Sequence, residues 1–398
     1  MPWCLRGSNY LYMLKEKFLI SKDITYLNFG SFGACPKPVF ERYQQYQQEL
    51  EAEAVQFIVH TGPQYLKTSR EALGRYLGCD ADDLVYVTNP SYAVNIVAKS
   101  LDLQPGDEIL ATNIEYGACD RTWDFYCHKA GAVYKRQPIQ LPLESREHFV
   151  QQFLSGITTK TKLIFISHIT SATALRLPVE EICAAAKEQG VPVFIDGAHA
   201  PGQVSLNIEV LGADLYTGAC HKWMMTPKGS SFLYASKAWQ DKLEPLVVSW
   251  GYNALFPSHS RFLDYHQMQG TRDFSAFLVM PDAIEFMQQH DWWNVAKYYR
   301  EMTQQHAERF CRLLNAQPLA PVQDDFILQM FSTRIQTLAP EGLQRHLFEQ
   351  YKIEVPVMRQ GDEVYLRYSL NAFNTQEDLD KLYDAVAEIK IKTTFIEQ

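Results

Sequence analysis

Short apolar runs alternate with helical patterns through the first two thirds of the chain. The apolar runs cover residues 84–87, 109–111, 163–166 and 191–195, and polar or glycine-containing turns follow each of them. Strand and helix patterns that alternate in this way are typical of a parallel sheet with helices on both faces. We therefore expect an α/β fold with a mainly parallel sheet.

Two helices are well marked in the sequence. A surface helix is predicted from Pro36 onward, where apolar residues recur at spacings of four, three and four: Val39, Tyr43, Tyr46 and Leu50. A last helix is predicted from Thr375, because Asp378 stands at the capping-box position three residues later and one face is then apolar.

The pattern changes in the second half of the chain and suggests a second domain. The alternation ends near Tyr234, and after Gly270 there are two long helical stretches, a strand-like segment at 326–335 and a β-rich segment at 353–370. We expect an N-terminal helical segment over residues 1–20, a large α/β domain over 21–262 and a smaller α+β domain over 263–398.

Composition and charge narrow the class of protein. The chain has 398 residues, of which 46% are hydrophobic and 21% charged, so it can bury a large core and is not disordered. The formal net charge is −9, and no dense run of Lys and Arg could follow a phosphate backbone, so we expect no nucleic-acid partner.

Cysteine usage and the N-terminus indicate a cytoplasmic protein. The eight cysteines are scattered without a C-x-x-C pair, and adjacent Cys–His pairs such as Cys127-His128 lack a further cluster, so we predict free thiols and no metal. Charged residues interrupt the first twenty positions, and no segment reaches the roughly 18 apolar residues that a membrane helix needs. We expect no membrane contact.

A carboxylate at the end of a predicted strand is the first candidate for chemistry. Asp196 ends the apolar run in IDGAHAPGQ (195–203), and parallel strands deliver such side chains to the crevice at their carboxyl ends. Its alternative role is to cap the helix after the strand.

A lysine after the next predicted strand is the second candidate. Lys222 lies between His221 and the bulky residues from Trp223 onward in ADLYTGACHKWMMTPKGSSFLY (213–234). Burial there would lower its pKa and give the neutral amine that attacks a carbonyl carbon. Alternatively, Lys222 is a surface lysine whose stem lies over Trp223.

Together, the acid and the lysine match the needs of pyridoxal 5'-phosphate (PLP). An acid keeps the pyridine nitrogen protonated, and a lysine holds the aldehyde as an imine. At this point the chain resembles the class V aminotransferase family of fold-type I PLP enzymes, most closely its isopenicillin N epimerase-like branch. Beside the two segments above, the resemblance rests on YLNFGSFGACP (26–36), VTNPSYAVNIV (87–97), TNIEYGA (112–118), SHITSATALRLP (167–178), QGTRDFSA (269–276) and LRYSLNAFN (366–374).

The resemblance implies roles for individual residues. Lys222 would carry the cofactor, Asp196 would face its pyridine nitrogen, Tyr116 would stack on its ring and His199 would contact its 3-hydroxyl side. The phosphate would be held by Pro90, Ser91, Tyr92 and His221. Ser91 also opens a predicted helix, where free backbone N–H groups attract anions, although a plain helix cap is its alternative role.

The substrate side and the partner follow from the same resemblance. Arg367 would bind the α-carboxylate, and Asn28, Ser31 and Ser171 would lie on the substrate side. Thr271 would reach the phosphate in the partner subunit, which implies a homodimer with shared sites.

The resemblance also implies the function. We expect a PLP-dependent enzyme that acts on the α-carbon of an amino acid or a derivative, by epimerisation through a quinonoid intermediate. Alternatives are a C–S lyase like the hercynylcysteine sulfoxide lyases, an aminotransferase and a catalytically silent protein of the same fold. The absence of a cysteine between Ile353 and Leu370 argues against a desulfurase that forms a protein persulfide.

Overall fold

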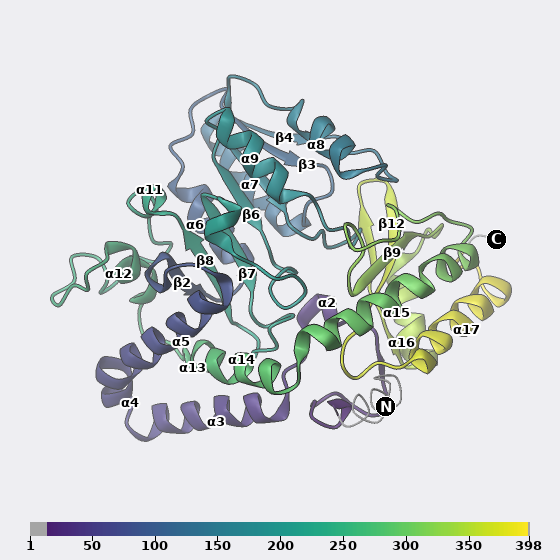
Figure 1. Cartoon of the computed structure of the whole chain (residues 1–398), viewed down its shortest axis with the longest axis horizontal. Helices are drawn as coiled ribbons and strands as arrows, with labels where there is room; N and C mark the ends of the chain where they lie inside the picture. The colour runs from purple at the N-terminus through teal and green to yellow at the C-terminus, as the bar shows by residue number, and fades with distance from the viewer. Residues whose placement is uncertain (1–13, 397–398) are drawn as a thin grey trace.

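A large unit and a smaller unit lie side by side in the computed structural model, which describes residues 14–396 (Figure 1). Most of the predicted N-terminal segment over residues 1–20 therefore lies outside the described residues. No helix in the described part of the chain is both long and apolar enough to cross a membrane.

A seven-stranded sheet forms the centre of the large unit. Its strand order is β2-β8-β7-β6-β5-β3-β4, and β8 alone runs antiparallel to its neighbours. The predicted mainly parallel sheet is thus confirmed. The strands are β2 (Leu84–Val87), β3 (Glu108–Thr112), β4 (Val133–Gln137), β5 (Thr161–Ser167), β6 (Val193–Asp196), β7 (Leu215–Ala219) and β8 (Ser231–Ala235).

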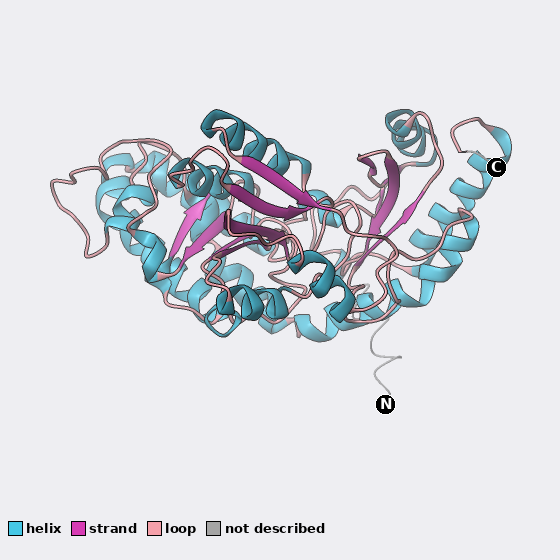
Figure 2. Ribbon diagram, turned by 90° about the horizontal axis from the view of Figure 1, so that it is seen from above, coloured by secondary structure: helices cyan, strands magenta, loops and turns pink. Residues whose placement is uncertain are grey.

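Helices cover both faces of this sheet, which explains its continuous apolar runs (Figure 2). Alternate residues of one strand enter different cores: Leu84 and Tyr86 join one buried cluster, whereas Val85 and Val87 join the other. The helices of the large unit and its N-terminal extension are α2 (Phe29–Phe32), α3 (Lys37–Ala52), α4 (Ala54–Gln56), α5 (Gly62–Leu77), α6 (Pro90–Ser100), α7 (Gly117–Ala130), α8 (Arg146–Leu154), α9 (Val179–Glu188), α10 (Ile208–Leu211) and α11 (Lys237–Gln240), with a π-helix η1 (Phe57–Thr61) and a 3-10 helix η2 (Ala81–Asp83).

The smaller unit combines a three-stranded antiparallel sheet with long helices. Its strand order is β11-β12-β9, and a short parallel pair joins β10 to β1. These strands are β1 (Thr25–Tyr26), β9 (Met330–Arg334), β10 (Ile353–Glu354), β11 (Val357–Gln360) and β12 (Glu363–Ser369). The helices in the second half of the chain are α12 (Arg261–Gln267), α13 (Ser275–Leu278), α14 (Met280–Gln289), α15 (Trp292–Leu313), α16 (Pro340–Tyr351) and α17 (Gln376–Lys392).

Several elements pack across the domain boundaries that the sequence predicts. Strand β1 pairs with β10 of the smaller unit, and α13 and α14 pack against α3 and α5 of the large unit. The division at residues 262 and 263 stays a prediction. The predicted capping box is present, since Thr375 and Asp378 cap α17 reciprocally.

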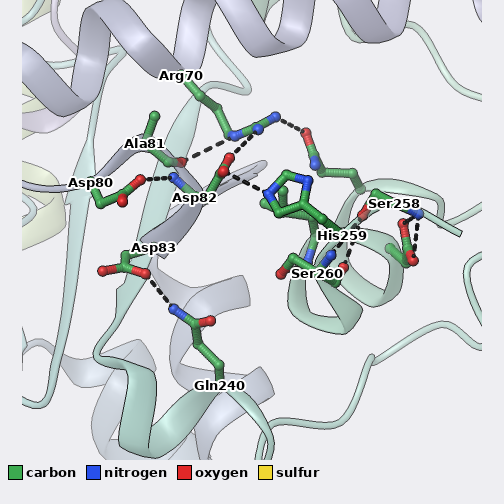
Figure 3. A network of polar contacts seen from close by, with 12 residues as sticks. Arg70, Asp80, Ala81, Asp82, Asp83, Gln240, Ser258, His259 and Ser260 are labelled. Atoms are coloured by element: carbon green, nitrogen blue, oxygen red, sulfur yellow. Dashed lines mark hydrogen bonds and ion pairs between the residues drawn. The ribbon is translucent and has the colours of Figure 1, made fainter.

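A polar network fastens the segment around α12 to the large unit (Figure 3). The guanidinium of Arg70 donates to Asp82 at 2.9 Å and to the side-chain oxygen of Gln267 at 2.9 Å, and His259 Nε2 lies 2.7 Å from the other oxygen of Asp82. Thr271, which the resemblance assigns to the phosphate of a partner subunit, follows α12 by only a few residues.

Candidate active site

A cavity of about 310 Å³ opens at the carboxyl ends of β5 and β6 and at the start of α6. This is where open α/β sheets bind ligands. Its lining residues are Ser31, Phe32, Asn89, Pro90, Ser91, Tyr116, Ser167, Ile169, Ser171, Asp196, Ala198, His199, His221 and Lys222. A larger hollow of about 420 Å³, between Tyr43 and Lys228, has no carboxylate in its lining. The chemistry therefore concentrates in the smaller cavity.

Asp196 is the last residue of β6 and is 3% exposed. One of its oxygens accepts the N–H of Ala198 at 2.9 Å, and the thiol of Cys119 donates to the other at 3.6 Å. Burial raises the pKa of this carboxyl, although the bonds from Ala198, the charge of Lys222 and the thiol of Cys119 oppose the rise. The capping alternative is wrong, because the next helix, α10, is capped by Asn207.

Lys222 enters the same cavity from the turn after β7, and its Nζ lies 3.2 Å from His199 Nε2. Burial lowers the pKa of its amine to about 8; the charge of Arg367 acts in the same direction and Asp196 opposes it. Lys222 lines the cavity and Trp223 is 1% exposed, so the alternative of a surface lysine whose stem lies over Trp223 is wrong.

Two histidines flank the lysine, and each is held in one orientation. The indole N–H of Trp223 donates to Nδ1 of His199 at 3.3 Å. His221 Nδ1 lies 2.9 Å from the carbonyl oxygen of Ser230; since a carbonyl only accepts, Nδ1 carries the proton. Burial lowers the pKa of His221 to about 4 and that of His199 well below its usual value.

The start of α6 forms one wall of the cavity. Asn89 caps this helix by accepting the N–H of Tyr92 at 2.9 Å, and Pro90 occupies the first turn. Ser91 lines the cavity beside the helix N-terminus, a place where backbone N–H groups attract anions. The phenol of Tyr92 points instead to the side-chain oxygen of Gln269, at 2.9 Å, and does not line the cavity.

Arg367 lies on β12 and reaches the cavity wall from the smaller unit. It is 1% exposed, donates to the carbonyl oxygen of Ser171 at 2.7 Å and to the hydroxyl of Ser31 at 3.1 Å. Asn28 accepts from Ser31 at 2.5 Å and stands 3.5 Å from the guanidinium. Burial lowers the pKa of Arg367 to about 10, and no described carboxylate forms an ion pair with it. The geometry leaves this cation available to an incoming anion.

Of the two remaining predicted residues, Tyr116 lines the cavity and Thr271 does not. Tyr116 precedes α7, lines the cavity and is 48% exposed. No hydrogen bond reaches its hydroxyl from the described residues. Thr271 is exposed and does not line the cavity of its own chain.

One buried carboxyl below the cavity was missed by the sequence analysis. Glu115 is 2% exposed; it accepts from the hydroxyl of Thr112 at 2.7 Å and from the backbone N–H and hydroxyl of Ser167 at 2.9 and 2.5 Å. Burial raises its pKa to about 8. The signal in the sequence was its place directly before Tyr116. The cavity residues Phe32, Asn89, Ser167, Ile169 and Ala198 were also missed.

Comparison with known sequences identifies relatives over nearly the whole chain. The class-V aminotransferase family matches residues 26–382. Isopenicillin N epimerases from Streptomyces clavuligerus and Amycolatopsis lactamdurans are 34% and 32% identical over 390 residues, covering 94% of this chain and 96% and 97% of theirs. An L-cysteine desulfhydrase from Arabidopsis thaliana is 25% identical, covering 91% of this chain and 87% of its own.

Solved structures share the fold. A cysteine desulfurase from Thermococcus onnurineus superposes with a TM-score of 0.81 at 18% identity, covering 95% of this chain and 97% of its own. A cystine C–S lyase described in complex with cysteine persulfide gives 0.77 at 22% identity, covering 92% and 98%. The predicted fold type I architecture and the predicted class, a PLP-dependent enzyme related to isopenicillin N epimerase, agree with these findings. The chain belongs to the class-V aminotransferase family.

Proposed function

We propose that the chain holds PLP covalently on Lys222 and removes the α-proton of an amino acid. The main support is that Lys222 and Asp196 line the same cavity, whose wall also includes the N-terminus of α6. When bound, PLP supplies an electron sink that acidifies the α-proton of an attached amino acid.

The donor set of the cavity fits this cofactor. The buried carboxyl of Asp196 would hold a proton at the pyridine nitrogen, and the α6 N-terminus with Ser91 would receive the phosphate. His221 would donate to the phosphate only through Nε2, because its Nδ1–H is committed to Ser230. His221 would therefore take up a proton at Nε2 when a phosphate is bound beside it.

Substrate binding falls to the residues on the other side of the cavity. Arg367, with Ser31 and Ser171 beside it, would receive the α-carboxylate through two N–H groups. The freed amine of Lys222 would take the α-proton, since its lowered pKa provides a neutral base near pH 8.

Epimerisation is the reaction that we propose, because the cavity holds a second acid. Three side chains near the lysine, Tyr116, His199 and Tyr92, are candidates for this acid. His199 is engaged by Lys222 and Trp223, and Tyr92 by Gln269 outside the cavity. Tyr116 lines the cavity with a hydroxyl that none of the described residues engages. Its phenol would return a proton to the α-carbon on the face away from Lys222.

Tyr116→Phe tests this assignment. We expect the rate of inversion to fall about 100-fold, the usual contribution of a positioned acid, while exchange of the α-proton with deuterated water persists through Lys222. Inversion and exchange would be followed over a panel of amino acids by chiral chromatography and mass spectrometry. Equal inversion in Tyr116→Phe and the unaltered enzyme would contradict the role of Tyr116.

C–S cleavage is the second candidate. It needs the same lysine and acid but no acid on the second face, and the chain resembles an L-cysteine desulfhydrase over 91% of its length. Sulfide released from cysteine, or cysteine persulfide released from cystine, unaffected by Tyr116→Phe, would favour this reaction over epimerisation. Keto acid formed without either sulfur product would indicate transamination and contradict both.

We also propose that the protein is a homodimer with shared sites. Thr271 is exposed and absent from the cavity of its own chain, and its neighbour Gln269 bonds Tyr92 at the edge of α6. These positions agree with a threonine that contributes to a partner's site. A mixture of Lys222→Ala and Thr271→Ala chains would then regain one complete site per mixed dimer, which activity after co-refolding measures.

A further inference from the structure

Trp223, the residue after Lys222, is fixed rigidly beside His199. Its indole is 1% exposed and packs on the ring of Phe29, with centroids 4.8 Å apart. Gly202 approaches it so closely that an added Cβ would lie 2.4 Å from the carbonyl oxygen of Trp223. Its Nε1 stands 3.3 Å from Nδ1 of His199. The direction of the indole N–H is therefore set by packing.

The chemistry of the two side chains fixes which atom donates and which accepts along this contact. An indole nitrogen only donates, so Nδ1 of His199 must accept. Burial keeps His199 neutral, and a neutral imidazole whose Nδ1 accepts carries its proton on Nε2. Nε2 lies 3.2 Å from Nζ of Lys222 and must donate to it. An ammonium has no lone pair, so only the neutral amine can accept this bond.

We propose that Trp223 is a positioning residue that fixes the proton of His199 on Nε2 and thereby favours Lys222 as a neutral amine, ready to attack a carbonyl carbon. The inference rests on the proposed role of Lys222 as the point of cofactor attachment. Trp223 would thus determine the position of a proton in the site in addition to packing against its neighbours.

Other groups also act on the lysine and must be kept constant in a test. Arg367 on β12 disfavours the ammonium, whereas Asp196 at the end of β6 and Cys119 on α7 favour it. Replacing Trp223 by Phe removes the indole N–H and leaves all three of these groups in place.

The experiment measures the reactivity of Lys222 in the full chain freed of cofactor. Formaldehyde and a borane reductant methylate only neutral amines, and peptide mass spectrometry follows Lys222 as a function of pH. In Trp223→Phe we expect methylation at pH 7 to fall about tenfold and the midpoint of the profile to rise by one pH unit, which is the same change expressed as a pKa. An unchanged profile would overturn the proposal.

The matched control is Trp123→Phe. Trp123 is fully buried in the same unit, on α7, and its indole nitrogen has no hydrogen-bond partner, so this change removes similar bulk without a bond. We expect the profile of Lys222 to stay as in the unaltered chain. Equal shifts in both tryptophan variants would show a general packing effect and overturn the proposal.

Two further measurements test the proposal independently, and the first needs no variant that could fail to fold. In the unaltered chain, ¹⁵N NMR of the imidazoles must show His199 with an unprotonated Nδ1 and a protonated Nε2; the reverse tautomer overturns the proposal. In a His199→Leu background, Trp223→Phe must cause no further change in the lysine profile, since its effect passes through His199. Because these readouts need no cofactor, they can fail while PLP still binds Lys222, or succeed while it does not.

Discussion

At the scale of single residues, Arg367 is a cation without a counter-ion. Its guanidinium is 1% exposed, bonds only carbonyl, hydroxyl and amide oxygens, and leaves Nε without a partner. Taking a charge out of water is costly unless an anion accompanies it. A substrate carboxylate would supply that anion in the working enzyme.

Arg367→Gln should therefore weaken the binding of amino acids. Loss of a buried, hydrogen-bonded charge pair costs about 2–5 kcal/mol, so we expect KM to rise at least 30-fold. Steady-state kinetics on the preferred substrate checks this. Arg359→Gln, an exposed arginine on the neighbouring strand β11, serves as the control and should leave KM within about twofold. A KM unchanged by Arg367→Gln would rule out this carboxylate site.

At the scale of secondary-structure elements, Glu115 joins the ends of two strands beneath the cavity. It accepts from Thr112 at the end of β3 and from Ser167 at the end of β5, and its backbone carbonyl accepts from Gln360 of the smaller unit at 2.7 Å. Because burial raises its pKa from 4.5 to about 8, the folded chain holds a proton that the unfolded chain releases. Its contribution to stability is then complete below pH 4.5 and is lost as the pH rises towards 8.

Glu115→Gln should flatten this pH dependence. Between pH 5 and 8 we expect the melting temperature of the unaltered chain to fall more steeply than that of the variant, because glutamine cannot ionise. Calorimetry at several pH values measures both slopes, with the exposed Glu209→Gln as control. Parallel slopes in all three proteins would mean that Glu115 ionises normally.

Gly33 ends α2 and lies against the turn that carries Lys222. Its φ is +64°, and an added Cβ would lie 2.2 Å from the carbonyl oxygen of His221 and 2.8 Å from Cα of Lys222. Gly106 has a similar positive φ, but no atom lies within 4 Å of an added Cβ. An alanine at Gly106 would therefore meet backbone strain alone, whereas an alanine at Gly33 would meet both backbone strain and a close contact.

Gly33→Ala should therefore cost more than Gly106→Ala. Both changes put a side chain at positive φ, but Gly33 also has ψ −174°, a conformation that essentially only glycine adopts, at a cost of about 1–3 kcal/mol. Only Gly33→Ala also displaces the turn around Lys222. We expect a lower melting temperature and less bound cofactor per chain in Gly33→Ala, measured by calorimetry and absorbance. Identical losses in the two variants would argue that the contact with Lys222 is unimportant.

The elements that were predicted correctly are those with a strong local pattern. Residues 84–87 and 163–166 are continuous apolar runs buried on both faces, and they are strands. Strand β4 was missed because it lies at the edge of the sheet and carries Lys135 and Arg136. Strand β1 has two residues and depends on its pairing with β10, which no local pattern reveals.

At the scale of the whole molecule, the candidate site is assembled from both units. Arg367 and Gln360 of the smaller unit reach Ser171 and the backbone of Glu115 in the large unit. The sequence motifs led to the cavity residues Asp196, His199 and Lys222 because strand ends and family motifs mark them. The bonds of Glu115 and of Trp223 were not predicted, since they depend on how distant segments meet in the fold.

Peptide mapping after reduction tests the central claim most directly. The purified chain would be reconstituted with PLP, reduced with borohydride, digested and analysed by mass spectrometry. We predict a pyridoxyl group on Lys222, absent from Lys222→Ala and unchanged in Lys228→Ala, a nearby exposed lysine. A label on another lysine, or a chain that binds no PLP at all, would contradict the account.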